Sequence, residues 1–304
     1  MLPLSLGLML CATSCEQKPS QAISADPPTR PPSASTNAQV FQVKGVVEAV
    51  TPAEKTVRIH HEEIPGYMDA MTMPFEVKDT NELAGLAAGD AVTFRMMVTE
   101  TDGWIDQIRK LEVDPTAKPP PASTQIRIVR DVEPLDMGDA LPEYHFTNQL
   151  GQAVSLGQFR GQALAFTFIF TRCPYPTFCP LMSNNFRAVQ DALLAKANAP
   201  TNWHLLTISF DPDYDTPGRL KDYSAMYHCD PAHWSFLTGT LVDVTALSEQ
   251  VGLQFWRDPG GAGINHNLRT VVVDAQGRVQ KIFTENKWTV EELTAEMEKA
   301  AESK

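Results

Sequence analysis

The chain has 304 residues, of which 43% are hydrophobic and 20% are charged, and its formal net charge at pH 7 is −12. This length and composition are typical of globular material with roughly two domains. The negative charge argues against nucleic acid and anionic membrane surfaces as partners, because both are bound through clustered Lys and Arg.

The first fifteen residues are typical of an export signal. Residues 2–10 form an apolar run that is too short to span a bilayer but has the length of a signal-peptide core. Small residues then lead to Cys15, which resembles a bacterial lipobox and predicts cleavage before Cys15 with a lipid on its sulfur. We therefore expect a cell-envelope protein, anchored through this lipid and facing the periplasm or the exterior. The alternative is a disordered apolar tail.

Two stretches rich in Pro, Ser, Ala and Thr divide the remaining chain. Residues 16–39 predict a flexible tether, and residues 115–138 predict a Pro-rich linker, because neither composition can bury a core. We therefore expect two domains, residues 40–114 and residues 139–304.

The sequence of residues 40–114 predicts an all-β domain, because apolar and polar residues alternate in short segments separated by turn-forming residues. The expected strands are 41–50, 55–61, 71–77, 91–100 and 104–113. Five short strands in so small a span predict a closed barrel of the OB type.

Residues 139–304 alternate strand and helix patterns, which predicts an α/β domain with a central sheet. The apolar runs 163–170 and 203–210 are typical of strands buried on both faces. We expect a hairpin over 269–283 and helices over 181–198, 216–228 and 289–303. Thr216 is expected to cap the second helix, and Thr289 with Glu292 has the spacing of a capping box.

Two cysteines flank the end of the first buried strand and the start of the helix that follows it. Cys173 is expected in the loop and Cys179 near the helix N-terminus, whose partial positive charge stabilises a thiolate. A protein stabilised by disulfide bonds would carry more cysteine pairs than this one has. We therefore interpret Cys173 and Cys179 as a redox-active pair or as part of a metal site.

A metal site needs further ligands, and His266 is a candidate. Thiolates select soft ions such as Cu(I), and imidazole suits copper in either oxidation state. His266 follows a glycine-rich segment and precedes a predicted strand, in a loop that would return beside the cysteines in a thioredoxin-like sheet. The alternative is a surface histidine that makes an ordinary hydrogen bond.

Three segments resemble the Sco/SenC family of copper chaperones: "SLGQFRGQALAFTFIFTRCPYPTFCP", "ISFDPDYDTP" and "INHNLRTVVVDAQGRV". The resemblance covers about residues 140–304 and implies a thioredoxin-like fold that binds one copper ion through Cys173, Cys179 and His266. The family's usual pair is CxxxCP, whereas this chain has two more residues between the cysteines. This departure keeps thiol–disulfide chemistry open beside copper delivery.

Three methionines fall within six residues of the predicted all-β domain, just after two histidines. On a strand Met71 and Met73 point to the same face, with Met68 shortly before them. Thioethers are soft ligands that suit Cu(I) or Ag(I) where thiols would be oxidised. The alternative is ordinary core packing.

This stretch resembles the CusF-like periplasmic copper/silver-binding domain, a small five-stranded barrel. The resemblance covers about residues 40–114 and implies His61, Met71 and Met73 as ligands, or His60 if the register differs. Where that family often caps the ion with a tryptophan, this chain has Tyr67 and Met68, and Met68 is a candidate extra ligand.

Two further groups of residues leave alternatives open. Asp211 and Asp215 lie in the "DPDYDTP" turn and are expected to form the turn and cap the next helix, or to act near the metal. Cys229 with His228 and His233 is either a free buried cysteine beside exposed histidines or a second metal site.

Together these patterns predict a lipid-anchored copper chaperone with two copper sites, and no nucleic-acid partner. The methionine site would capture Cu(I) and pass it to the Cys/Cys/His site. The linker that joins the two domains would raise the effective concentration of one site beside the other. The Sco/SenC resemblance implies the copper centre of a respiratory oxidase subunit as acceptor. The alternatives are a thiol–disulfide oxidoreductase that reduces acceptor cysteines, and a copper buffer or sensor.

Overall fold

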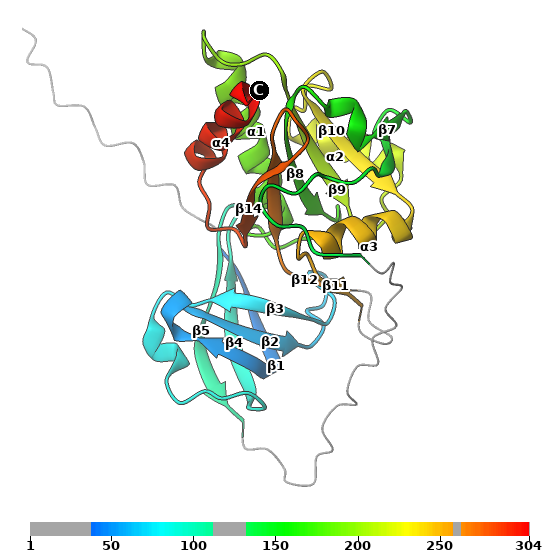
Figure 1. The fold of residues 1–304 in the computed structure, drawn as a ribbon. Coiled ribbons are helices and arrows are strands. Elements are labelled where there is room, and N and C mark those ends of the chain that lie inside the picture. The colour runs from blue at the N-terminus through cyan, green and yellow to red at the C-terminus, as the bar shows by residue number, and fades with distance from the viewer. Residues whose placement is uncertain (1–37, 112–131, 258–262, 304) are drawn as a thin grey trace, which may run out of the picture. The chain divides into compact units, whose positions relative to one another are not determined.

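The computed structural model describes residues 38–111, 132–257 and 263–303 (Figure 1). The predicted signal segment, lipidation at Cys15, nearly all of the tether and most of the linker therefore lie outside the described residues. Within the described part, no helix combines the length and apolar character needed to cross a membrane.

The first part of the chain folds into an antiparallel five-stranded sheet with the order β3-β2-β1-β4-β5. Its strands are β1 (Gln39–Thr51), β2 (Thr56–His61), β3 (Met71–Glu76), β4 (Ala91–Val98) and β5 (Gly103–Lys110). Alternate residues of β4 are buried, as the period of two requires for a sheet with one face on a core. The 3-10 helices η1 (Pro52–Glu54) and η2 (Thr80–Leu83) follow β1 and β3. The five predicted strands are confirmed.

The predicted closure of this sheet into a barrel is wrong. Among the described residues the edge strands meet through one isolated parallel bridge, between Val77 and Ile105. A closed barrel needs a continuous ladder, but β3 ends at Glu76 and the chain then turns into η2. The N–H of Ile108 donates instead to the Glu82 carboxylate of η2, at 2.9 Å.

The second part of the chain forms a seven-stranded mixed sheet with the order β14-β13-β8-β9-β10-β6-β7. Its strands are β6 (His145–Asn148), β7 (Ala153–Ser155), β8 (Ala163–Ile169), β9 (Trp203–Ser209), β10 (Trp234–Gly239), β13 (Arg269–Val273) and β14 (Val279–Thr284). The central strands β8, β9 and β10 are parallel, and the outer pairs are antiparallel. Every residue of β8 and β9 is buried, as their continuous apolar runs predict.

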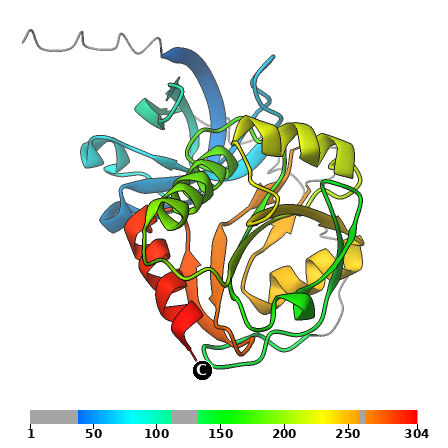
Figure 2. The same cartoon turned by 90° about the horizontal axis from the view of Figure 1, so that it is seen from above.

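Helices cover both faces of this sheet. The helices are α1 (Cys179–Ala195), α2 (Pro217–Met226), α3 (Leu241–Gln250) and α4 (Val290–Glu302), with the 3-10 helix η3 (Leu156–Phe159) after β7. Helices α1 and α4 pack on each other over one face, and α3 lies on the other (Figure 2). Thr216 caps α2, and Thr289 and Glu292 form the predicted capping box of α4. The predicted α/β class is confirmed.

Residues 36–304 form one compact unit. The Tyr67 hydroxyl of the first sheet's β2–β3 segment donates to the Pro174 carbonyl oxygen at 3.1 Å. The N–H of Thr72 in β3 donates to the side chain of Asn265. Asn265 belongs to the short strand β12 (Asn265–His266), which pairs with β11 (Phe255–Trp256). The exact domain boundaries stay a prediction.

Candidate metal centre

The two cysteines lie at the carboxyl end of the central parallel strands. Strand β8 ends at Ile169, a loop follows, and α1 begins at Cys179 with Pro180 in its first turn. Pro180 fits there because the first N–H groups of a helix have no partner inside the helix. Cys173 therefore lies in the loop and Cys179 at the helix start, as the sequence predicts.

The structure brings Cys173, Cys179 and His266 together. Their ligand atoms all lie within 4.8 Å of one another, and they form the only such group of three or more His, Cys, Asp or Glu residues found in the described ranges. Cys179 and His266 are buried, Cys173 is half-buried, and both cysteines are free thiols. Residues 87 positions apart in the chain thus meet, because β12 returns to the end of β8 where the cysteine loop starts.

The two thiols differ in acidity. Burial raises the pKa of Cys179 well above its ordinary value, and a hydrogen bond to Cys173 adds to this effect. Burial also opposes ionisation of Cys173, but hydrogen bonds from Cys179 and His266 and the charge of His266 bring the pKa of Cys173 well below its ordinary value. The two shifts are opposite in direction, so the thiolate is favoured on Cys173 and the thiol on Cys179.

The ring of His266 is fixed in orientation. Its Nδ1 lies 2.9 Å from the Asn267 carbonyl oxygen, so the ring is held with its Nε2 toward Cys173, to which His266 is hydrogen-bonded. Three aromatic rings surround the imidazole at centroid distances of 5.6 Å for Phe170, 5.5 Å for Phe178 and 5.0 Å for Phe210. This apolar collar holds the ring and keeps water from it.

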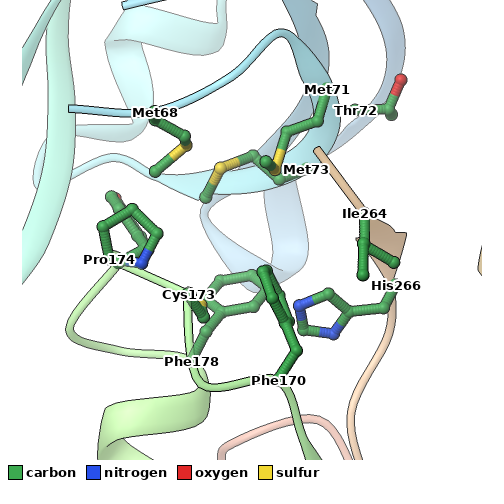
Figure 3. Close-up of a pocket in the computed structure, with 11 residues that line it drawn as sticks. Met68, Met71, Thr72, Met73, Phe170, Cys173, Pro174, Phe178, Ile264 and His266 are labelled. Atoms are coloured by element: carbon green, nitrogen blue, oxygen red, sulfur yellow. The ribbon is translucent and has the colours of Figure 1, made fainter. Parts of the chain in front are cut away.

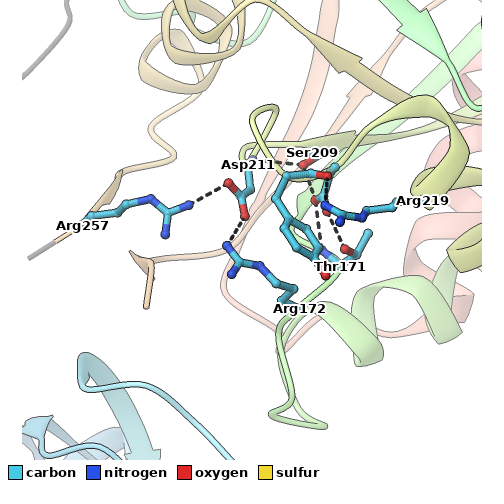
Figure 4. A network of polar contacts seen from close by, with 8 residues as sticks. Thr171, Arg172, Ser209, Asp211, Arg219 and Arg257 are labelled. Carbon is cyan, nitrogen blue, oxygen red and sulfur yellow. Dashed lines mark hydrogen bonds and ion pairs between the residues drawn. The ribbon is translucent and has the colours of Figure 1, made fainter. Parts of the chain in front are cut away.

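A buried carboxylate holds the segment that leads into Cys173 (Figure 4). Asp215 accepts from the N–H of Thr171 at 3.0 Å, from its hydroxyl at 2.5 Å, and from the Ser209 hydroxyl at 2.6 Å. The helix cap expected from this turn is supplied by the side chain of Thr216. The carboxylate of Asp215 thus positions the cysteine loop.

A second carboxylate joins the two segments that carry the ligands. The carboxylate of Asp211 is almost fully buried and accepts from Arg172 at 2.8 Å and from Arg257 at 2.7 Å (Figure 4). Arg172 precedes Cys173, and Arg257 follows β11, the partner strand of β12. The sequence pointed to both aspartates of the turn but not to these arginine partners, because ion pairs across about 40 residues leave no local pattern.

The first sheet places the predicted methionine ligands on its inner face. His61 pairs directly with Met71 across β2 and β3, and Ile59 pairs with Met73. His61, Met68, Met71 and Met73 are all buried. The register therefore selects His61, because His60 lies on the opposite face with its Nδ1 3.1 Å from the Thr72 hydroxyl.

His61 has the chemistry of a metal ligand. Its Nδ1 lies 2.8 Å from the Glu62 carbonyl oxygen, and its Nε2 is buried without a hydrogen-bond partner. Burial lowers the pKa of His61 to about 4, although the hydrogen bond to Glu62 favours the charged form. A neutral imidazole with a free, buried nitrogen fits a soft metal ion beside thioethers.

The methionines face Cys173 and His266 across one cavity (Figure 3). The cavity has a volume of about 10 Å³, close to the space that a single buried water molecule occupies. Its walls carry the side chains of Met68, Met71 and Met73 on one side and those of Cys173 and His266 on the other. None of the residues lining it is acidic, so its donors are sulfur and imidazole nitrogen.

Cys229 is separate from this centre. Its sulfur lies 3.0 Å from the Trp234 carbonyl oxygen, and burial raises its pKa to about 12. His233 stacks on Trp203 at 4.4 Å. Within the described ranges, Cys229, His228 and His233 do not form a ligand cluster. The structure therefore gives no support to a second metal site here.

A thioredoxin-like sheet with a Cys/Cys/His cluster at the end of its central strand defines a soft-metal or redox protein. Residues 133–302 match the family model of SCO1/SenC, and residues 40–110 match the model of the copper binding periplasmic protein CusF. The chain belongs to the SCO1/SenC family, because that match covers more than half of it. Copper is the metal that these families indicate.

Two curated relatives show the extent of the similarity. The SCO1 protein homolog of Bacillus subtilis (strain 168) is 35% identical over 96 residues, which are 32% of this chain and 47% of that protein. A putative copper-binding protein of Stutzerimonas stutzeri is 28% identical over 144 residues, 46% of this chain and 67% of that protein. The chain therefore spans about half the length of the Bacillus relative.

Solved structures of the same family are also similar. A SCO1/SenC family lipoprotein from Bacillus anthracis str. Ames is 27% identical with a TM-score of 0.47, over 54% of this chain and 95% of that one. Copper-bound ScoI of Bradyrhizobium japonicum is 25% identical with a TM-score of 0.45, over 54% of this chain and 99% of that one.

Proposed function

We propose that this protein is a copper chaperone of the cell envelope that delivers copper from its Cys/Cys/His site to an acceptor protein. The observation that carries the proposal is the cluster of Cys173, Cys179 and His266, whose ligand atoms lie within 4.8 Å of one another. Two sulfurs and one imidazole nitrogen are the donors that select Cu(I) and still accept Cu(II). Copper is cargo in this function.

The electrostatics of the cluster suit an ion that must be both bound and released. Cys173 offers a thiolate without prior loss of a proton, whereas Cys179 must give up its proton to bind as a second thiolate. His266 is already turned toward the cluster, and copper would take the place of the proton in its hydrogen bond to Cys173. The half-buried Cys173 also gives an acceptor a point of approach.

The first sheet would supply a second Cu(I) site. His61, Met71 and Met73 lie on one buried face, and the His61 Nε2 has no other partner. Met68 borders the same cavity and would add a further thioether. This site would capture Cu(I) first, since thioethers survive where thiols are oxidised.

The acceptor and the location are part of the proposal. A respiratory oxidase subunit with a copper centre is the acceptor that the family implies, and a lipid on Cys15 would hold the protein at the membrane. Both can be tested in cells, by oxidase activity in a deletion strain and by labelling with a radioactive fatty acid. A Cys15→Ser variant should lose the label, and deletion should lower oxidase activity unless copper is added.

The first test is an anaerobic titration of the whole chain with Cu(I), against a chromophoric chelator. Cys11 and Cys15 are replaced by serine so that only the described thiols remain. We expect two equivalents bound, and one in a Cys173→Ser/Cys179→Ser double variant. A Met71→Leu/Met73→Leu variant should lose the other equivalent. A stoichiometry that is the same in the parent and in the cysteine double variant would contradict copper binding at the Cys/Cys/His site.

The second candidate function is a thiol–disulfide oxidoreductase. The low pKa of Cys173 and the free thiol of Cys179 beside it favour this alternative, because a thiolate attacks the disulfide of an acceptor and a neighbouring thiol resolves the mixed disulfide. Reduction of a copper-free acceptor's disulfide, lost in Cys173→Ser, would support it. A pair that stays reduced in air only while copper is bound would instead favour the chaperone.

A further inference from the structure

The loop between the two cysteines inserts a tyrosine into the first sheet. Tyr175 is 2% exposed, although it lies in a loop. A Cβ on Gly103, the first residue of β5, would lie 2.7 Å from the Cζ of this tyrosine. The Tyr175 ring also meets Phe75 of β3 edge to face, at 6.0 Å. The missing side chain at position 103 thus makes the space that the tyrosine occupies.

We propose that the cysteine loop is a latch that docks the first sheet onto the Cys/Cys/His cluster, so that copper passes directly between the two sites through the cavity that both line. This inference rests on the proposed copper function and specifies its first transfer step. In that step the methionine face of the same chain gives copper to the Cys/Cys/His site.

Two further contacts hold the same arrangement. Tyr67 donates to the carbonyl oxygen of Pro174, the residue after Cys173. Thr72, between the two ligand methionines of β3, donates its N–H to the side chain of Asn265, the residue before His266. Each contact joins a residue next to a methionine ligand with a residue next to a Cys/Cys/His ligand. The ligand sets are therefore aligned by their immediate neighbours.

The cavity gives the transfer a direct route. Met68, Met71 and Met73 point toward Cys173 and His266 across a space that holds about one small ion (Figure 3). In the transfer, Cu(I) leaves the thioethers and His61 and binds the Cys173 thiolate and the His266 Nε2. Copper stays in the +1 state and no electron moves. When Cys179 joins as a thiolate, its proton is released to solvent.

The structure offers matched variants for this latch. Tyr175→Ala removes the ring, whereas Tyr175→Phe removes only a hydroxyl that is buried without a hydrogen-bond partner. Gly103→Ala fills the space from the opposite side without altering the cysteine loop. We therefore expect Tyr175→Phe to behave as the parent protein, and Tyr175→Ala and Gly103→Ala to undock the first sheet.

Docking can be measured without copper by zero-length cross-linking. Glu54 of η1 and Lys287, in the segment between β14 and α4, come from the first and second parts of the chain; their side chains lie 2.9 Å apart and are exposed, so a carbodiimide should join them in an amide with loss of water. Lys196 and Glu298, an ion pair within the second part, serve as the internal control. Mass spectrometry should find the Glu54–Lys287 cross-link in the parent and in Tyr175→Phe, and at least fivefold less of it in Tyr175→Ala and Gly103→Ala.

Transfer is measured by stopped flow under anaerobic conditions. One equivalent of Cu(I) is added to the whole chain with Cys11 and Cys15 replaced by serine, and the thiolate–Cu(I) absorption is followed. We expect a rate independent of protein concentration in the parent, and a rate at least tenfold slower and dependent on concentration in Tyr175→Ala and Gly103→Ala.

The outcomes separate the latch from the copper function. Loss of the cross-link with two copper equivalents retained supports the latch and shows that the variants are folded. A cross-link that is absent from the parent, or unchanged in both variants, overturns the latch while copper binding stands. Equal transfer rates in the parent and in all three variants overturn direct transfer through the cavity. Failure of the parent to bind copper would instead overturn the proposed function.

Discussion

His61 and His266 are held in the same way. In each ring the Nδ1 lies within 2.9 Å of the carbonyl oxygen of the next residue, so the Nε2 of each is the nitrogen turned toward its site. Backbone carbonyls therefore fix both tautomers, in different sheets of the chain. Neither ring has to turn to meet an ion.

Removing the free nitrogen of His61 should weaken the methionine site selectively. We expect His61→Ala to lower Cu(I) affinity at that site by about tenfold or more, because one of three ligands is lost. His60→Ala is the matched control, since His60 lies on the other face and bonds to Thr72. The measurement is chelator competition in the Cys173→Ser/Cys179→Ser background. Equal loss in the two variants would contradict the assignment.

The thiols should differ in their reaction with iodoacetamide in the copper-free protein. Cys173 should react at a rate that changes little around neutral pH, since its pKa lies well below the ordinary value and the thiolate is already formed. Cys229, with a pKa raised to about 12, should react slowly, with a rate that rises about tenfold per pH unit. Peptide mass spectrometry follows each site.

A variant of His266, which hydrogen-bonds to Cys173, tests the source of this reactivity. His266→Ala removes a hydrogen bond and a charge that lower the pKa of Cys173. Alkylation of Cys173 should then slow at pH 7 and regain its rate at higher pH. A rate that is unaffected by His266→Ala would show that the acidity of Cys173 has another source.

Asp215 should contribute to stability as well as to the position of the loop. Asp215→Ala leaves the N–H and hydroxyl of Thr171 and the hydroxyl of Ser209 without their acceptor. We expect the free energy of unfolding to fall by about 2–3 kcal/mol, the usual cost of unsatisfied buried groups. Asp213→Ala, at an exposed position of the same turn, should change it by less than about 0.5 kcal/mol. Urea unfolding compares them, and equal effects would contradict the anchoring role.

Acid should destabilise the protein through His204. Burial lowers the pKa of His204 from 6.5 to about 4, with the charge of His233 adding to the effect. Between these values the unfolded chain binds a proton that the folded chain does not, so stability falls as the pH falls. The slope is up to about 1.4 kcal/mol per pH unit from this residue. The difference between the urea midpoints at pH 7 and pH 5 should therefore become smaller in His204→Asn, with the equally shifted His61 contributing the remainder, and should stay unchanged in a variant of the exposed His145.

Local signals accounted for much of the fold. The helix starts at Cys179, Thr216 and Thr289 were predictable, because proline, threonine and glutamate act on the nearest turn. Strand β10 (Trp234–Gly239) and helix α3 (Leu241–Gln250) were not predicted, although Thr240 accepts from the N–H of Asp243 as an ordinary N-cap. This cap was a signal that could have identified α3.

Features that depend on distant parts of the chain were not accessible. Closure of the first sheet depends on where the chain goes after Glu76, and no residue pattern encodes that path. Cys173, Cys179 and His266 were identified by residue type and by the family resemblance. The tyrosine in the space beside Gly103 and the Asp211–Arg257 pair arise only when separate segments pack.

The unequal exposure of the three ligands gives ligand exchange an order. Cys179 is fully buried and His266 is enclosed by three aromatic rings, whereas Cys173 is half-buried in a loop. An incoming thiolate or imidazole of an acceptor would reach an ion at this site from the side of Cys173. The bond to Cys173 would then break first in every exchange, with Cys179 and His266 retaining the ion until the newcomer has bound. In the proposed function this order gives an associative hand-over, in which copper is never free.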